Sequence, residues 1–192
     1  MKNCLSFDDV LMLPKYSEVT SRKEISLERK LQNDLSFSLP IISSPMDTVT
    51  EVAMATEMSG LGGLGIIHRY NSPDEQARLV ENTVLSGKDS KRVTVGFAVG
   101  VGEDMLERTR KCLNAGASVV CIDIAHGHHA LMRHALKVLR NTFGNDLHIM
   151  AGNVATKEGY EDLARWGASS VRVGIGGGSI CSTRIQTGHG MP

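Results

Sequence analysis

The sequence predicts an α/β fold of the (β/α)8 barrel type, incomplete, on three observations. Short apolar runs rich in Val and Ile alternate with stretches of helical periodicity, which is typical of parallel strands joined by helices. This alternation alone fits an open doubly wound sheet equally well. Polar residues directly after several runs favour the barrel, whose carboxyl face carries such residues. The chain has 192 residues and about six strand–helix units, whereas a complete barrel takes roughly 250 residues, so we expect the last two units to be absent.

The expected strands and helices make one domain, residues 1–192, with no inserted regulatory module. The clearest helix start is at Ser72, which can cap the helix before Pro73, with Glu75 completing a capping box. The triplets at residues 116–118 and 167–169 both read Gly-Ala-Ser between a helical stretch and a strand, a weak internal repeat. Six runs are interpreted as strands: residues 40–44, 64–68, 93–99, 119–124, 148–152 and 171–176.

The first 30 or so residues precede this alternation. Their apolar side chains are expected to pack beneath or beside the barrel. The segment 17–32 is charged and is expected to form a surface hairpin or loop. The apolar residues in question are Leu5, Phe7, Val10, Leu11 and Leu13.

Charge and cysteine content exclude several classes of protein. Lys plus Arg and Asp plus Glu both number 21, so no net field favours nucleic acid or an anionic membrane. No apolar stretch approaches the roughly 20 residues that span a bilayer. The four cysteines, Cys4, Cys112, Cys121 and Cys181, form no Cys-x-x-Cys pair, and the N-terminus lacks a signal segment. We therefore expect a soluble protein in the reducing cytoplasm.

The most specific pattern is residues 171–183, where an apolar strand breaks into a glycine-rich loop that ends at Cys181 and Thr183. Glycines let the backbone take positive φ and approach a ligand closely, and Ser179 offers a hydroxyl and an amide to a phosphate. Cys181 lies where a nucleophile would lie. Two plainer interpretations stay open at this point: a small buried thiol, and a loop serine that bonds its own backbone.

From Arg172 to Thr183 this pattern resembles the signature loop of the IMP dehydrogenase and GMP reductase family. The resemblance extends to residues 5–14, 43–51, 121–127 and 151–155, and so covers essentially the whole chain. It implies a purine nucleotide oxidoreductase in which a cysteine thiolate attacks C2 of a nucleoside monophosphate, and a covalent adduct is held during hydride transfer. Such a reaction requires a partly exposed thiol in an electropositive setting.

The resemblance also implies a role for each matching residue. Cys181 is the nucleophile and Thr183 acts near the reacting carbon. The nucleotide is contacted by Ser44, Met46, Asn153, Arg172, Gly178 and Ser179. The NAD cofactor is contacted by Asp123, Ala125, His126, Gly174 and Gly176. Backbone carbonyls of Gly176, Gly178 and Cys181 hold a potassium ion, although glycine flexibility alone would explain the glycines.

Two of these positions have structural alternatives. Arg172 lies within an apolar strand, so either Asp123 or a neighbouring carboxylate could simply neutralise it, and Asp123 after its buried strand could serve as a cap. Nearby, His126, His128 and His129 lack a carboxylate or thiolate at metal-binding spacing, so a solvated loop is expected there and no metal.

Three features favour the dehydrogenase: residues 48–51 after Met46-Asp47, the loop 125–128, and arginine at position 172. They predict NAD-linked oxidation of IMP to XMP through a covalent thioimidate. The alternative is a GMP reductase, which converts GMP to IMP with NADPH. Only residues 69–92 separate His68 from Val93, too few for the regulatory module that most such dehydrogenases insert there and that reductases lack. The flap that separates the two activities would follow Pro192.

Two further classes stay open. One is a non-catalytic nucleotide-phosphate-binding module with an idle Cys181. The other is a barrel enzyme for a different phosphorylated substrate, because the fold alone implies no chemistry. We expect the 192-residue chain to be inactive by itself. We also expect it to associate, because the family forms homotetramers and an incomplete barrel exposes apolar surface.

Overall fold

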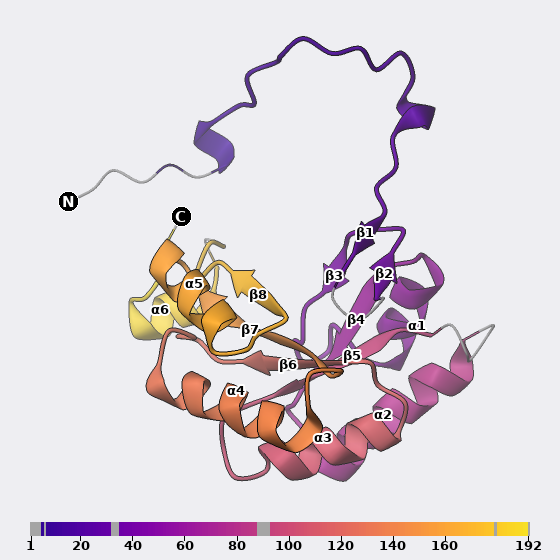
Figure 1. Ribbon diagram of the computed structural model, residues 1–192, viewed down its shortest axis with the longest axis vertical. Helices are drawn as coiled ribbons and strands as arrows, with labels where there is room; N and C mark the ends of the chain where they lie inside the picture. The colour runs from indigo at the N-terminus through magenta and orange to yellow at the C-terminus, as the bar shows by residue number, and fades with distance from the viewer. Residues whose placement is uncertain (1–4, 6, 32–34, 88–92, 179, 192) are drawn as a thin grey trace.

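The computed structural model describes residues 5, 7–31, 35–87, 93–178 and 180–191. Its centre is a parallel sheet of six strands in the order β3-β4-β5-β6-β7-β8. The sheet curls, with helices on its outer side, and confirms the expected incomplete barrel (Figure 1). The strands are β3 (Ile42–Ser43), β4 (Leu64–Ile67), β5 (Val95–Val99), β6 (Val119–Asp123), β7 (His148–Val154) and β8 (Ser170–Val173).

Helices alternate with these strands as the sequence predicts. An antiparallel pair, β1 (Arg29–Lys30) and β2 (Ser36–Phe37), and two short 3-10 helices, η1 (Phe7–Asp9) and η2 (Arg22–Glu24), precede the sheet. The helices are α1 (Val52–Gly60), α2 (Pro73–Ser86), α3 (Met105–Asn114), α4 (Ala130–Phe143), α5 (Lys157–Arg165) and α6 (Ser182–Thr187).

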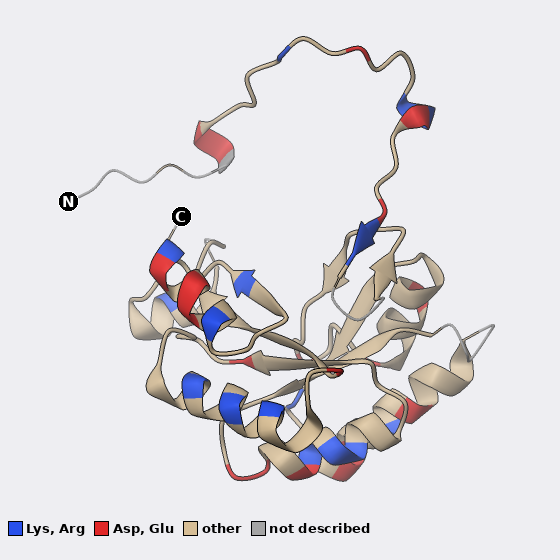
Figure 2. Ribbon diagram, in the orientation of Figure 1, with Lys and Arg blue, Asp and Glu red and all other residues tan. Residues whose placement is uncertain are grey.

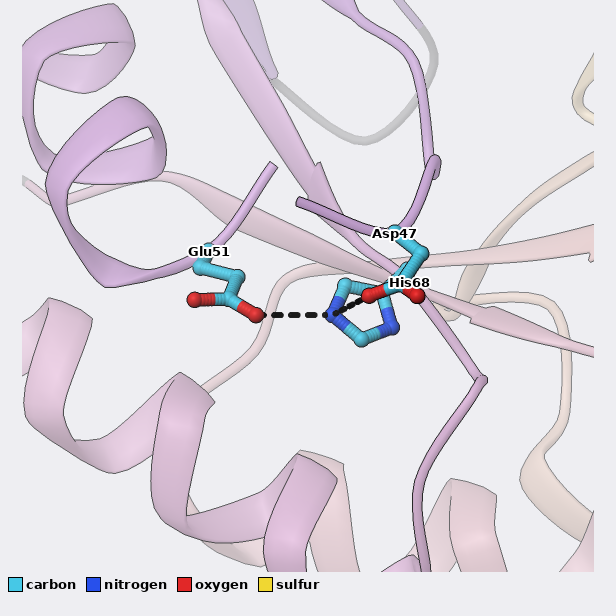
Figure 3. A group of neighbouring side chains, drawn as sticks. All are labelled: Asp47, Glu51 and His68. Carbon is cyan, nitrogen blue, oxygen red and sulfur yellow. Dashed lines mark hydrogen bonds and ion pairs between the residues drawn. The ribbon is translucent and has the colours of Figure 1, made fainter. Parts of the chain in front are cut away.

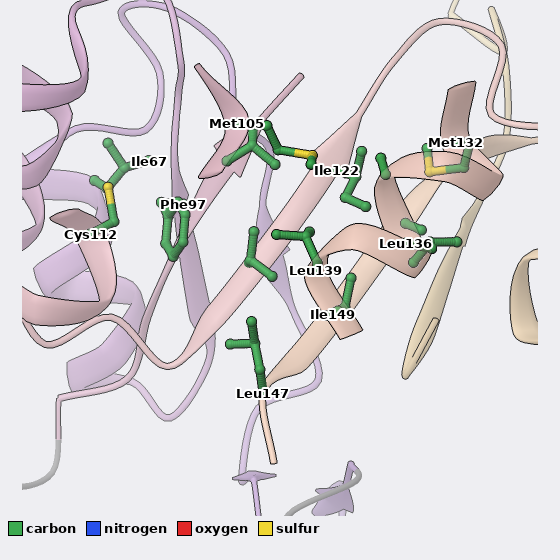
Figure 4. Packing of buried hydrophobic residues seen from close by; sticks show 14 of the residues in the cluster. Ile67, Phe97, Met105, Cys112, Ile122, Met132, Leu136, Leu139, Leu147 and Ile149 are labelled. Carbon is green, nitrogen blue, oxygen red and sulfur yellow. The ribbon is translucent and has the colours of Figure 1, made fainter. Parts of the chain in front are cut away.

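The main core lies between the sheet and its outer helices (Figure 4). Phe97 of β5, Ile149 of β7 and Leu136 of α4 are fully buried in it. A smaller cluster lies on the inner face of the sheet, where Phe37 of β2 packs with Leu64 and Val119 at the beginnings of β4 and β6. The β1–β2 pair therefore closes the amino end of the curled sheet and leaves the carboxyl end accessible.

The two Gly-Ala-Ser triplets form the same helix-to-strand turn. Gly116 and Gly167 both take positive φ, at 100° and 108°, a conformation that glycine adopts without a steric penalty. In each turn the amide of the residue after the glycine donates to a carbonyl of the preceding helix. Ala117 donates to the Cys112 carbonyl (3.1 Å), and Ala168 donates to the Leu163 carbonyl (3.0 Å). The internal repeat is therefore real at the level of backbone geometry.

The predicted start of α2 is confirmed in part. The Ser72 hydroxyl accepts the Glu75 amide (3.1 Å), and Pro73 occupies the first turn. The Glu75 carboxylate pairs with Arg78, whereas a capping box would have it accept the backbone amide of Ser72.

The prediction for the N-terminal segment is wrong. Leu5, Val10, Leu11 and Leu13 are 65%, 42%, 99% and 84% exposed, and the segment extends away from the sheet (Figure 1). These residues lie in chain without regular structure around Pro14, so they share no face that could cover the sheet. The side chain of Phe7 lies outside the described part of the chain. Within residues 17–32, the described residues form η2 and β1 joined by irregular chain, all but Leu31 exposed.

Charged residues of both signs lie along the outer helices (Figure 2). Within the described part of the chain, none of the helices combines the length and the apolar character needed to cross a membrane.

Candidate active site

Three predicted site residues meet where β6, β7 and β8 end. The strand register aligns Asp123 with Gly152, and Gly152 with Arg172. Arg172 Nη1 donates to Asp123 Oδ1 at 2.7 Å, and Asn153 Nδ2 donates to the same oxygen at 3.3 Å. The Arg172 and Asp123 side chains are 27% and 25% exposed. The expectation that Asp123 neutralises Arg172 is confirmed, and the pair is accessible enough to meet a ligand.

The described cysteines have opposite environments. Cys112 and Cys121 are buried, and burial raises the pKa of each thiol to about 12. The Arg172 guanidinium, 3.7 Å from the Cys121 sulfur, offsets only part of that effect. Both are protonated at neutral pH and unreactive as nucleophiles.

Cys181 is only half-buried and lies at the N-terminus of α6. The backbone amides of Arg184 and Thr183 face its sulfur and lower the pKa of the thiol, with a smaller contribution from the Thr183 hydroxyl. Amides at a helix N-terminus stabilise a thiolate in this way. Among the described cysteines, Cys181 is therefore the one suited to nucleophilic attack.

The glycine loop that leads to Cys181 has open backbone at Gly174 and Gly177, whereas Gly176 between them packs closely against the segment 184–190. The Gly174 amide donates to the Val154 carbonyl (2.7 Å), and the Cys181 amide donates to the Gly178 carbonyl (3.0 Å). Gly174 and Gly176 take positive φ, at 129° and 64°. A side chain at Gly174 or Gly177 would meet nothing within 4 Å. This open backbone can face a ligand, as the sequence predicts. Ser179, the predicted phosphate ligand, lies outside the described residues.

A hollow of about 240 Å³ lies between the edge strands β3 and β8. Ser44 and Arg172 line it together with apolar side chains such as Ile66 and Met150. Met46, two residues after Ser44, is 57% exposed. The curled sheet thus brings two of the predicted nucleotide contacts to one space although they are far apart in the sequence.

Cys181 and Thr183 follow β8, and the segment after α6 lies beside the loop predicted to hold NAD. The His126 ring, in the loop after β6, lies 6.3 Å from the His189 ring, which follows α6. His128 pairs with Asp162 of α5 (2.9 Å), and His129 accepts the Leu131 amide (3.1 Å) as the cap of α4. His128 and His129 are thus engaged in structural contacts, and the absence of a metal from this loop stays a prediction.

The residues assigned to potassium lie along the loop that leads to α6. Gly176 lines a space of about 230 Å³ with Arg184, Gly188, Gly190 and Met191. The Gly178 carbonyl accepts the Cys181 amide. The potassium assignment stays a prediction.

One group of side chains was not assigned from the sequence. Asp47 and Glu51, in the loop between β3 and α1, approach His68, which follows β4 (Figure 3). Glu51 belongs to the quoted motif of residues 43–51, and His68 was noted only as a polar residue after a strand. Nothing in their spacing indicated that they meet.

Comparison with known proteins places these features in one family. The model of the IMP dehydrogenase / GMP reductase domain matches residues 4–192. An inosine-5'-monophosphate dehydrogenase from Cryptosporidium parvum is 38% identical over 226 aligned positions, covering 98% of this chain and 55% of the relative. Another, from Nitrosopumilus maritimus, is 30% identical over 310 positions, covering 100% of this chain and 65% of the relative.

A GMP reductase from Shigella boydii is 37% identical over 194 positions, covering 98% of this chain and 54% of that protein. This chain therefore spans 54% to 65% of the length of these three relatives.

Proposed function

Because the chain belongs to the IMP dehydrogenase and GMP reductase family, we propose that it forms part of the active site of a purine nucleotide oxidoreductase of the IMP dehydrogenase type. One observation carries the proposal. Cys181, directly after an open glycine loop, is the described thiol whose pKa is lowered, whereas burial raises the pKa of Cys112 and Cys121.

In the proposed reaction, the Cys181 thiolate forms a bond to C2 of IMP, and the hydrogen at C2 leaves with its electron pair. NAD, when bound, accepts that hydride. Water then adds to C2 of the thioimidate, the S–C2 bond breaks, XMP leaves and one water proton is released. We assign Thr183, in the first turn of α6, to orienting the attacking water. The lowered pKa keeps Cys181 available as thiolate for the first step.

Described residues fit the NAD assignment. Asp123 uses Oδ1 for both Arg172 and Asn153, which leaves Oδ2 for a ribose hydroxyl. Ala125 and His126 are exposed beside it, and the Gly174 backbone has open space around it. Asp123, Ala125, His126, Gly174 and Gly176 would therefore hold the dinucleotide. The hydrogen bond from Arg172 fixes the orientation of the Asp123 carboxylate.

For the nucleotide, we assign Ser44, Met46, Asn153, Arg172 and Gly178. Ser44 and Arg172 line one hollow, which supports this assignment. The homotetramer and the cytoplasmic location stay predictions.

Alkylation by iodoacetamide tests the proposal. In a Cys4→Ser background, Cys181 should react at least about 100-fold faster than Cys112 and Cys121, because their thiolate fractions differ by that much or more. The labelling rate should rise with pH through a midpoint below the ordinary thiol value of 9.0. IMP should protect Cys181, and Cys181→Ser should abolish the fast phase.

The other outcomes identify the alternatives. Slow Cys181 labelling without protection by IMP would contradict the proposal and favour a non-catalytic phosphate-binding module. If ribose 5-phosphate protects as well as IMP does, the chain does not recognise a purine and the substrate is another phosphorylated compound.

A GMP reductase is the second candidate, and the lengths of the alignments favour it. The match to the Shigella boydii GMP reductase extends over 194 positions, close to the length of this chain, whereas the two dehydrogenase matches extend over 226 and 310 positions. The spacing of this chain is therefore closer to that of the reductase. Protection of Cys181 by GMP at a lower concentration than IMP would favour the reductase, which uses NADPH.

A further inference from the structure

His68 has one definite protonation pattern in this structure. The ring is almost fully buried, at 3% exposure. Its Nδ1 accepts the backbone amide of Tyr70 at 3.2 Å, so Nδ1 carries a lone pair and the neutral ring carries its proton on Nε2. That Nε2–H points at Glu51 Oε1, 3.2 Å away, with Asp47 Oδ1 at 3.8 Å (Figure 3). His68 is therefore a donor toward the loop between β3 and α1.

The backbone of His68 is held in place by a buried hydrogen-bond network. Gln76, which is fully buried, donates from Nε2 to the carbonyls of His68 (2.9 Å) and Ala98 (2.8 Å). The Gln76 side-chain oxygen accepts from Arg108 (3.0 Å), which is also tied to Asp104 (2.8 Å). A buried hydrogen-bond network of this kind rigidifies its members. His68 thus offers a stationary donor.

The loop that His68 reaches carries Met46 and contains a backbone conformation that must be held in place. Thr48 takes a φ of 59°, a left-handed conformation that is unfavourable for a residue other than glycine and persists only where neighbours over-determine it. Thr50 anchors one side of the loop through its hydroxyl to the Ser44 carbonyl (2.6 Å). Glu51 begins α1 without a side-chain capping bond, so its carboxylate is free to serve the His68 contact.

We propose that His68 is a positioning residue of the nucleotide site: as the Nε2–H tautomer it holds Glu51, and thereby keeps the loop of residues 44–51 in the conformation that presents Met46 to the ligand. The identity of that ligand rests on the function proposed above. The hydrogen bond and its effect on the loop do not.

The same three side chains have the composition of a metal site, with donor atoms within 4.8 Å of one another. The surroundings of the ring argue against it. A metal bound at Nε2 requires the proton on Nδ1, where it would point at the Tyr70 amide hydrogen. Binding would therefore sacrifice the Tyr70 bond, and we assign the cluster to positioning.

The tautomer is the first measurement. Long-range ¹H–¹⁵N spectra of the full 192-residue chain, labelled at histidine, should show His68 protonated at Nε2 and unprotonated at Nδ1. His68→Gln assigns the signals. A proton on Nδ1 would overturn the proposal. A His68 signal displaced by equimolar Zn²⁺ would overturn it in favour of a metal site.

The second measurement follows the loop through the ¹³C-methyl signal of Met46, assigned with Met46→Leu. Glu51→Ala should displace this signal. Glu51→Gln should retain it, because the amide oxygen still accepts the Nε2–H. Glu57→Ala, at an exposed glutamate of the same helix, is the matched control and should also retain it. An unchanged Met46 signal in Glu51→Ala, or a displaced one in Glu51→Gln, contradicts the hydrogen-bonded positioning.

Titration with IMP separates this proposal from the proposed function. If IMP moves the Met46 signal of the wild-type chain, Glu51→Ala should bind IMP about tenfold more weakly, the effect of one hydrogen bond to a charged group. Equal affinity of the two chains would then overturn the positioning role. If IMP leaves Met46 unaffected, the proposed function fails, whereas the tautomer and the Glu51 variants still decide the role of His68.

Discussion

The centre of the sheet and its β8 edge are maintained by different forces. Every residue of β5 is buried, and the strand contributes Val95, Phe97 and Val99 to the main core. β8 is only partly buried, and the glycine loop and α6 after it are held mainly by backbone hydrogen bonds. Side-chain packing therefore stabilises the centre of the sheet, where no chemistry is proposed. The candidate nucleophile follows the β8 edge, where the backbone is accessible to a ligand.

Removing core volume should have the largest effect and mark the packed region. Phe97→Ala deletes a fully buried ring of β5 and should lower the free energy of unfolding by about 3–5 kcal/mol. Ile185→Ala, in α6 and 69% exposed, should change it by no more than about 0.5 kcal/mol. Urea denaturation followed by circular dichroism measures both. Comparable losses in the two variants would mean that the two regions are packed alike.

An intermediate effect is expected at Arg172, where the β8 edge joins the centre. Arg172→Met leaves the Asp123 carboxylate, 25% exposed, with the Asn153 side chain as its hydrogen-bond partner among the described residues, and should cost about 2 kcal/mol of stability. The control is Arg78→Met, which removes a pair that is 67% and 44% exposed and should cost no more than about 0.5 kcal/mol. A double-mutant cycle with Asp123→Asn isolates the pair; a coupling near zero would refute the assignment.

The smallest effect is expected in acid, at the half-buried pair of His128 and Asp162. Hydrogen bonding from His128 and the nearby Arg165 charge lower the pKa of Asp162 below its ordinary value of 3.8. A carboxyl whose pKa is lower in the folded state stabilises the fold above its unfolded pKa, and this contribution is lost as the pH falls through the folded value. The stability difference between the wild type and Asp162→Asn should therefore be constant above about pH 5 and shrink below about pH 4.

Urea titrations at several pH values measure that difference. His128→Ala should reduce the acid dependence. A difference that grows as the pH falls would have the wrong sign and would mean that Asp162 is not stabilised by His128.

Most of the fold could be predicted because its signals are local. The apolar runs that became β4 to β8 carry their own periodicity, Ser72 and Pro73 mark the start of α2, and Gly116 and Gly167 terminate helices by the same turn. The prediction for the N-terminal segment was wrong because burial is not a local property. Leu11 and Leu13 are apolar, but whether an apolar residue is buried depends on a surface to cover, which no local pattern specifies.

The candidate site divides in the same way. The glycine loop and Cys181 were recognisable because they are contiguous in the sequence. The Arg172–Asp123 pair joins residues 49 positions apart, and it was anticipated only because an arginine inside an apolar strand requires a partner. The Glu51–His68 contact was missed because each residue has an ordinary polar position after a strand.

The sequence by itself determined the alternation of strands and helices, the positions of the tight glycine turns and the loop that carries Cys181, since these depend on propensity and backbone freedom within a few residues. Only the tertiary structure decided the environment of each described thiol, because burial among distant neighbours raises the pKa of Cys112 and Cys121 to about 12, whereas nearby backbone amides lower the pKa of Cys181. It also decided that Glu51 lies next to His68. Burial and electrostatics act through space, so the same residue type acquires opposite chemistry in different parts of one chain.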